Sequence, residues 1–132
     1  MTYDTMTDAE LNAAVAEKVM GFHDITTGRV SGLLIGLPPG VSRPKSGNTA
    51  HHKKVPHYST SIADAFEVVE KMRSLRFGYA LNNARDWNSN RAAFFWMQKH
   101  PHYQSDRKVG REASGPLPRA ICIAALMAVE KS

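Results

Sequence analysis

Acidic residues are missing from a long central stretch of this 132-residue chain. Between Ile25 and Ala63 there is no Asp or Glu, and the basic side chains of the stretch are Arg29, Arg43, Lys45, Lys53 and Lys54, with His51, His52 and His57 among them. The chain has 17 basic and 12 acidic residues in all, so the formal net charge of +5 resides within this stretch. Charge concentrated in this way predicts an anionic partner.

Cysteine and long apolar runs are scarce as well. The single Cys122 excludes an internal disulfide, and its place in a helical apolar pattern predicts a small buried hydrophobe, not a reactive thiol. Apolar runs are much shorter than the ~20 residues that span a bilayer, so we expect no membrane partner. Residues 1–10 lack the basic and apolar parts of a secretion signal, which predicts an intracellular protein.

Two helices are indicated in the first half of the chain. Thr7 and Glu10 have the spacing of a capping box, and apolar residues recur at helical spacing until about Met20, before Gly21. The exposed face of this helix is expected to carry Asn12 and Glu17. A second helix is predicted to start at Thr60 or Ser61. Its expected inner face consists of Ile62, Phe66, Val69 and Met72 or Arg73.

The last helix is expected over Leu117–Lys131, where prolines at 116 and 118 suit a first helical turn. Its apolar residues extend nearly all the way round. Such a helix needs cover on more than one side, so either it is sandwiched within the domain or one flank forms a subunit interface. We expect a homo-oligomer.

The strand signals are shorter. Val30–Leu37 could form a strand, and residues 38–56 are expected to form an irregular loop, so that a basic loop rich in Gly and Pro spans about 28–56. Alternation over Phe77–Asn82 and an aromatic run over Arg91–Gln98 predict an antiparallel pair. Arg107–Ala113 is a candidate third strand at an edge. Three helices and antiparallel strands in one domain, residues 1–132, predict an α+β fold.

Three segments carry a family resemblance: Leu11–Gly21, Tyr58–Met72 and Pro118–Leu126. Together, and in this order, they resemble the phage ABA sandwich domain family, small proteins of bacteriophages and prophages. The resemblance implies an α/β/α sandwich, in which a small, mainly antiparallel sheet has helices on both faces. It also implies a protein of the infected bacterial host's cytoplasm, and it supplies no catalytic residue.

Catalytic and metal-binding patterns are not found in the sequence. The six histidines lack the His-Glu-x-x-His spacing of zinc sites, and with one Cys there is no Cys-x-x-Cys pair. We therefore expect the histidines to be exposed loop residues. No nucleophile elbow, papain-like Cys or Walker loop is present. These absences favour a protein that is not an enzyme and has no cofactor or metal.

An anion site is predicted where the basic loop leads into the second helix. Backbone N–H groups at a helix start, together with the helix dipole, favour a phosphate, and hydroxyl side chains there would add donors. The predicted ligand-binding residues are Arg43, Lys45, His52, Lys53, Lys54, His57, Tyr58, Ser59, Thr60 and Ser61. The alternative is an ordinary capped helix beneath a solvated loop.

Three functional hypotheses follow from this predicted site. The first is a phage accessory protein that binds a nucleotide-like ligand, as sponges that antagonise nucleotide-signalling bacterial immunity do. Aromatic side chains would then stack on a base, with Tyr58, Trp87, Trp96 and Tyr103 as candidates. The second is a nucleic-acid-binding protein, whose affinity would fall steeply with salt. The third is an interaction module that docks an acidic host protein.

Overall fold

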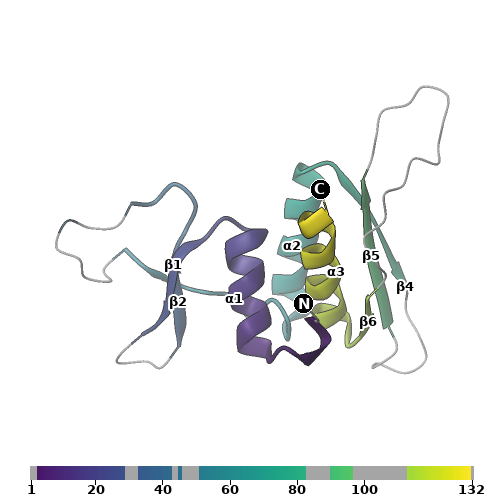
Figure 1. Ribbon diagram of the computed structural model, residues 1–132, viewed down its shortest axis with the longest axis horizontal. Helices are drawn as coiled ribbons and strands as arrows, with labels where there is room; N and C mark the ends of the chain where they lie inside the picture. Colours follow the sequence, from purple (N-terminus) through teal and green to yellow (C-terminus); the bar gives the residue numbers. More distant parts are fainter. Residues whose placement is uncertain are drawn as a thin grey trace.

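The structure is a computed structural model that describes residues 3–28, 33–42, 45, 51–82, 90–96 and 113–131. These residues form three α-helices and six β-strands, and the strands make two antiparallel three-stranded sheets. In Figure 1 the helices lie between the two sheets. The predicted α+β class is confirmed, with the antiparallel strands divided between two sheets.

Helix α1 spans Asp8–Lys18 and begins as its sequence predicts. The Thr7 side chain accepts a bond from the backbone N–H of Glu10, and the Glu10 carboxylate accepts one from the backbone N–H of Thr7. The helix ends two residues earlier than predicted, before Gly21, whose φ of 84° is the left-handed conformation that glycine adopts easily. Asn12 was expected on the exposed face, but it is buried.

Helix α2 spans Ile62–Ser74, with Ser61 as its N-cap, but the predicted inner face is partly wrong. Ile62 and Phe66 are 40% and 46% exposed. The buried side chains are those of Ala65, Val68, Val69 and Met72. The helix packs against α3 and β4, and a small residue such as Ala65 lets two helices approach closely where the larger Phe66 would keep them apart.

Helix α3 spans Leu117–Lys131, as predicted, and is the centre of the core. Every residue of 120–126 is buried. Helices α1 and α2 pack against α3, as do two strands of the neighbouring sheet, so the helix is sandwiched within the domain. This position accounts for its apolar surface, which therefore no longer argues for a subunit interface. The homo-oligomer stays a prediction.

The sheet beside α2 and α3 contains β4 (Phe77–Asn82), β5 (Asn90–Trp96) and β6 (Ala113–Gly115). The predicted antiparallel pair is confirmed, with Tyr79 opposite Phe94. The predicted third strand, Arg107–Ala113, meets β6 at one residue, and its first six residues lie outside the described part of the chain. Among the described strands, β6 pairs with β5 alone and lies at the edge, as expected.

The sheet beside α1 has the order β1 (His23–Thr27), β2 (Leu34–Leu37) and β3 (Lys53–Lys54). Strand β2 confirms the second half of the predicted Val30–Leu37 strand. The other two strands were not predicted, and β3 lies in the expected irregular loop. Two consecutive lysines have a low strand propensity, so only pairing with β2 makes this segment a strand.

Cys122 of α3 is fully buried, as its sequence context predicts. Burial raises the pKa of its thiol to about 12, so the neutral thiol persists well above pH 8 in the folded protein. We expect no labelling of Cys122 by a thiol reagent at pH 8 under native conditions, and complete labelling in urea. Intact-protein mass spectrometry measures both. Rapid labelling without denaturant would contradict this burial.

Candidate functional site

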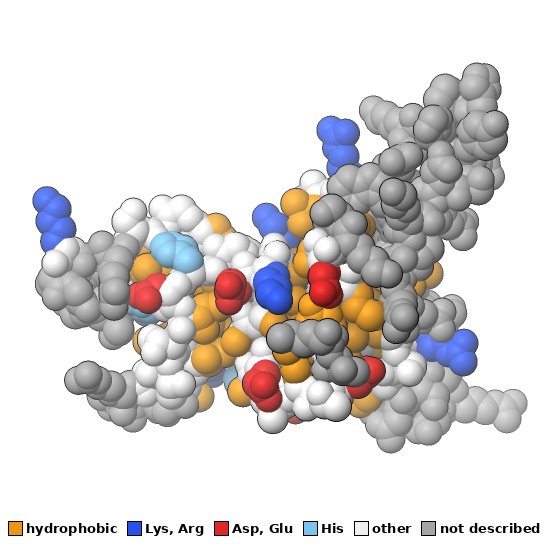
Figure 2. Space-filling view, viewed as in Figure 1, with side chains coloured by type: hydrophobic (Ala, Val, Ile, Leu, Met, Phe, Trp, Pro, Cys, Tyr) orange, Lys and Arg blue, Asp and Glu red, His pale blue; other side chains and the backbone are white. Residues whose placement is uncertain are grey.

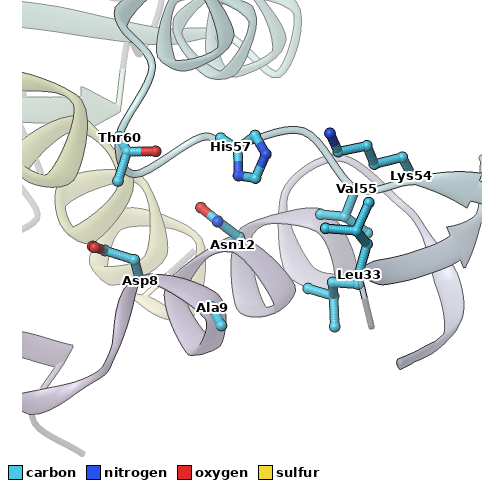
Figure 3. A pocket seen from close by; sticks show the side chains of 9 residues that line it. Asp8, Ala9, Asn12, Leu33, Lys54, Val55, His57 and Thr60 are labelled. Carbon is cyan, nitrogen blue, oxygen red and sulfur yellow. The ribbon is translucent and has the colours of Figure 1, made fainter. Parts of the chain in front are cut away.

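A hollow of about 260 Å³ lies between α1, β2 and the segment that joins β3 to α2 (Figure 3). One wall is apolar and comes mainly from the β2 and β3 region. The rest is polar and carries both cationic and acidic side chains. The lining residues are Asp8, Ala9, Asn12, Leu33, Leu34, Lys54, Val55, His57 and Thr60.

Lys54 and His57 lie together on one side of the hollow, where Lys54 supplies the positive charge. Both are exposed, and in Figure 3 the Lys54 side chain extends along the chain toward the imidazole of His57. The position of Lys54 is set by its pairing with Ile35 and by the buried Val55, whose N–H donates to the Leu34 carbonyl over 2.9 Å. His57 is held through its backbone N–H, which donates to Asp64 Oδ2 over 3.0 Å.

Asp8 provides the one carboxylate among the lining residues. It is the first residue of α1, where a negative charge interacts favourably with the helix dipole. Its Oδ1 accepts a bond from Arg119 Nη1 over 3.0 Å. The guanidinium balances the charge of Asp8, so the ammonium of Lys54 on the opposite side of the hollow sets the sign of the ligand that the hollow attracts.

Most of the hydroxyl and aromatic groups predicted at the start of α2 are engaged by the protein itself. Tyr58 is 1% exposed, and burial raises the pKa of its phenol above the ordinary value. The Ser59 N–H donates to Asn12 Oδ1 over 2.9 Å, and its hydroxyl donates to the Asp8 carbonyl over 3.3 Å. Ser61 accepts from the Asp64 N–H as the N-cap. Thr60 is the exposed member of the four.

The basic residues of the predicted site are not all brought to the hollow. His52 was expected to be exposed, but its side chain is only 1% exposed and its Nε2 lies 3.0 Å from Asp24 Oδ2. Lys53 is exposed, but neighbouring residues of a strand point to opposite faces, so it does not share the hollow with Lys54. Lys45 lies in an exposed turn, and Arg43 lies outside the described residues.

A second hollow, of about 380 Å³, adjoins the first, because Asp8 and Thr60 line both. Its other lining residues are Ser59, Pro116, Pro118 and Arg119. The starts of α1, α2 and α3 therefore meet at this place. Arg119 joins the start of α3 to that of α1: its Nη2 donates to the carbonyls of Asp4 and Met6, while its Nη1 donates to Asp8 Oδ1.

Several of these residues were missed by the sequence prediction. Asp8 and Asn12 belong to α1, and Arg119 to α3, so each is far in sequence from the basic loop. The capping box did place Asp8 at the start of a helix, but nothing in the sequence indicated which other helix would begin beside it. The buried Asn12 gave no signal, because the helical pattern put it on the exposed face.

The comparisons with known proteins agree with this architecture. Residues 13–126 match the sequence pattern of the phage ABA sandwich domain. The chain belongs to this family. A crystal structure of a phage protein from Bacillus cereus ATCC 14579 has a TM-score of 0.60 and 20% identity, over 97% of each chain. At that identity the likeness concerns the fold alone. Among curated proteins, none matches the chain.

Two further findings bear on this phage ABA sandwich protein. Within the described ranges, no three His, Cys, Asp or Glu side chains are grouped as the ligands of a metal ion. The same residues include no helix with the length and hydropathy that crossing a membrane requires.

Proposed function

We propose that this phage protein binds an anionic, nucleotide-like ligand in the hollow beside Lys54 and His57, and that it acts without catalysis. In the cytoplasm of an infected host, such binding would sequester a signalling nucleotide and antagonise bacterial immunity that depends on it. The observation that carries the proposal is the convergence of an exposed lysine, Lys54, and an exposed imidazole, that of His57, on one side of a hollow, both from the segment that holds the whole net charge.

The composition of the hollow suits a ligand with one anionic and one apolar part. A phosphate at this place would be attracted by the ammonium of Lys54 and would accept a hydrogen bond from a ring N–H of His57. The wall formed by Leu33, Leu34 and Val55 offers apolar contact to a planar ring. At the other end, the Asp8 carboxylate would accept a hydrogen bond from an amino group of such a ring.

A compact ligand agrees better with these features than an extended nucleic acid. On the face shown in Figure 2, acidic and basic side chains are interspersed over the helices, and the described residues form no continuous positive patch there. The hollow itself, at about 260 Å³, has room for one small ligand. Nucleic acid is the second candidate, because Lys45 and Lys53 are exposed outside the hollow and could contact a phosphate backbone.

A thermal-shift screen of linear and cyclic nucleotides tests the proposal. A nucleotide at 100 times its Kd should stabilise the protein by about 2.7 kcal/mol. In a domain of this size that raises Tm by on the order of 10 °C. Lys54→Glu should abolish the shift, because it places a carboxylate beside the phosphate.

Lys53→Glu is the matched control, since it makes the same change of charge one residue away on the opposite face of β3. It should keep most of the shift. Equal loss in both variants would point to diffuse electrostatic attraction in place of a site in the hollow. A short DNA duplex, at low and high salt, is the comparison ligand. Stabilisation by the duplex alone, lost at high salt, would support nucleic-acid binding and overturn the proposal.

A further inference from the structure

Strand β3 consists of two lysines, and so short a strand has few interactions of its own that could hold it in place. Both side chains are exposed, and within the part of the chain that the structure describes the strand pairs with β2 alone, with Lys53 opposite Gly36 and Lys54 opposite Ile35. Lysine is depleted in strands, and such a short edge strand gains little from backbone pairing alone. If the ligand is bound as proposed, the position of Lys54 nevertheless decides whether its ammonium reaches the hollow.

A side-chain pair spans the sheet next to this strand. His52, immediately before β3, places its Nε2 3.0 Å from Asp24 Oδ2 of β1. Strands β1 and β3 are the two edges of the sheet, with β2 between them, so the pair joins the edges across the central strand. The side chains of His52 and Asp24 are 1% and 35% exposed, so water competes little for the histidine end of this bond.

The local backbone is adapted to this pair. Asp24 has a φ of 52°, in the left-handed region that non-glycine residues seldom adopt, and the pairing of β1 with β2 is irregular between His23 and Thr26. Such an irregularity re-aims a side chain of the strand. Moreover, the Nδ1 atom of His52 is buried and makes no hydrogen bond with the described residues. Burying an unpaired nitrogen is unfavourable, so the ring needs its bond to Asp24 to remain buried.

We infer that Asp24 and His52 are positioning residues: the bond between their side chains fastens β3 to the sheet, and thereby directs Lys54 into the hollow. Asp24 holds the histidine ring in place. Because the ring is fixed, the backbone from His52 to Val55 is fixed beside β2 as well. The ligand part of this inference rests on the proposed function, whereas the fastening of β3 does not. Neither side chain lines the hollow, so neither one is expected to contact the ligand.

Hydrogen exchange of the Val55 amide measures the fastening without any ligand, because this N–H bonds to the Leu34 carbonyl at the end of β3. His52→Ala should accelerate its exchange roughly tenfold, the factor expected when a hydrogen bond to a charged group is lost. The amides of α3 serve as the internal control and should exchange as in the wild type. Unchanged exchange at Val55 would overturn the inference.

His52→Gln is the rescuing variant, because its side-chain N–H₂ can still donate to Asp24. It should restore slow exchange at Val55. Asp24→Asn keeps an acceptor oxygen at the same place and should have a smaller effect than His52→Ala. If His52→Gln exchanged as fast as His52→Ala, the bond to Asp24 would not be what holds the strand, and the inference would be wrong.

Titration of each variant with the nucleotide that shifts the wild type most completes the test. We expect His52→Ala to weaken binding roughly tenfold and His52→Gln to restore it. Faster exchange with unchanged affinity would overturn the positioning role toward the ligand. Should no nucleotide shift the wild type, the proposed function fails, and the exchange of Val55 still decides whether the pair fastens β3.

Discussion

Phe94→Ala should lower the free energy of unfolding by about 3–5 kcal/mol. Phe94 is fully buried in β5, next to the half-exposed Tyr79, at a ring-centroid distance of 6.5 Å. Removing its ring forfeits apolar burial and leaves a cavity between the sheet and the helices. Domains are stable by about 5–15 kcal/mol in total, so a loss of this size is a large fraction of the whole. Urea denaturation followed by circular dichroism measures it.

Phe66→Ala is the matched control for this prediction. The same side chain is removed, but Phe66 is 46% exposed on the outer face of α2, and alanine has the higher helix propensity. We expect Phe66→Ala to change the free energy of unfolding by no more than about 1 kcal/mol. If the two substitutions had equal effects, either Phe66 would be covered in solution, for example by a second copy of the chain, or the burial of Phe94 would be incorrect. Analytical ultracentrifugation of the wild type separates these two explanations.

Arg119→Ala should lower the free energy of unfolding by about 2–3 kcal/mol, which is a large effect for the replacement of a charged residue. The Arg119 side chain is 22% exposed, and its guanidinium donates to Asp8 Oδ1 over 3.0 Å, to the Asp4 carbonyl over 3.1 Å and to the Met6 carbonyl over 2.6 Å. The substitution therefore leaves three acceptors without their donor and loosens the N-terminal segment from α3. Arg119→Lys should recover little of this, because one ammonium group cannot match the planar guanidinium at three acceptors.

Arg73→Ala provides the comparison for Arg119. Arg73 also pairs with a carboxylate, that of Glu70 at 3.2 Å, but the two side chains are 58% and 71% exposed. Exposed ion pairs contribute little to stability, so we expect Arg73→Ala to change the free energy of unfolding by less than about 0.5 kcal/mol. Equal costs for the two arginines would contradict the structural role of Arg119. In addition, Arg119→Ala leaves the charge of Asp8 unbalanced in the hollow, and should weaken the binding of an anionic ligand.

The sequence predicted those elements that depend on local chemistry. Thr7 and Glu10 are close in the chain and cap each other, and Gly21 ends a helix because its own backbone tolerates a positive φ. The alternation of β4 is likewise a property of consecutive residues. By contrast, β3 was missed, because a pair of lysines becomes a strand only through β2, a partner about twenty residues away.

In the candidate site, too, some features follow from local sequence and others from contacts between distant residues. The basic stretch led to Lys54, His57 and Thr60, which the structure brings to one hollow. It also led to Tyr58 and Ser59, which are buried instead. A side chain at a helix start can point to solvent or into the core, and the choice is made by the packing of that turn against α1, where Asn12 accepts the Ser59 N–H. Sequence spacing carries no information on that contact.

By itself, the sequence determined where the positive charge lies, where the helices start, and that α3 has to be covered on several sides, because these follow from residue types and their periodicity. The tertiary structure decided which stripe of α2 faces inward, which cations meet, and that Asp8, Thr60 and Arg119 lie together. The physical reason is that packing selects among faces that local propensity leaves nearly equal in energy, through contacts between residues far apart in the chain.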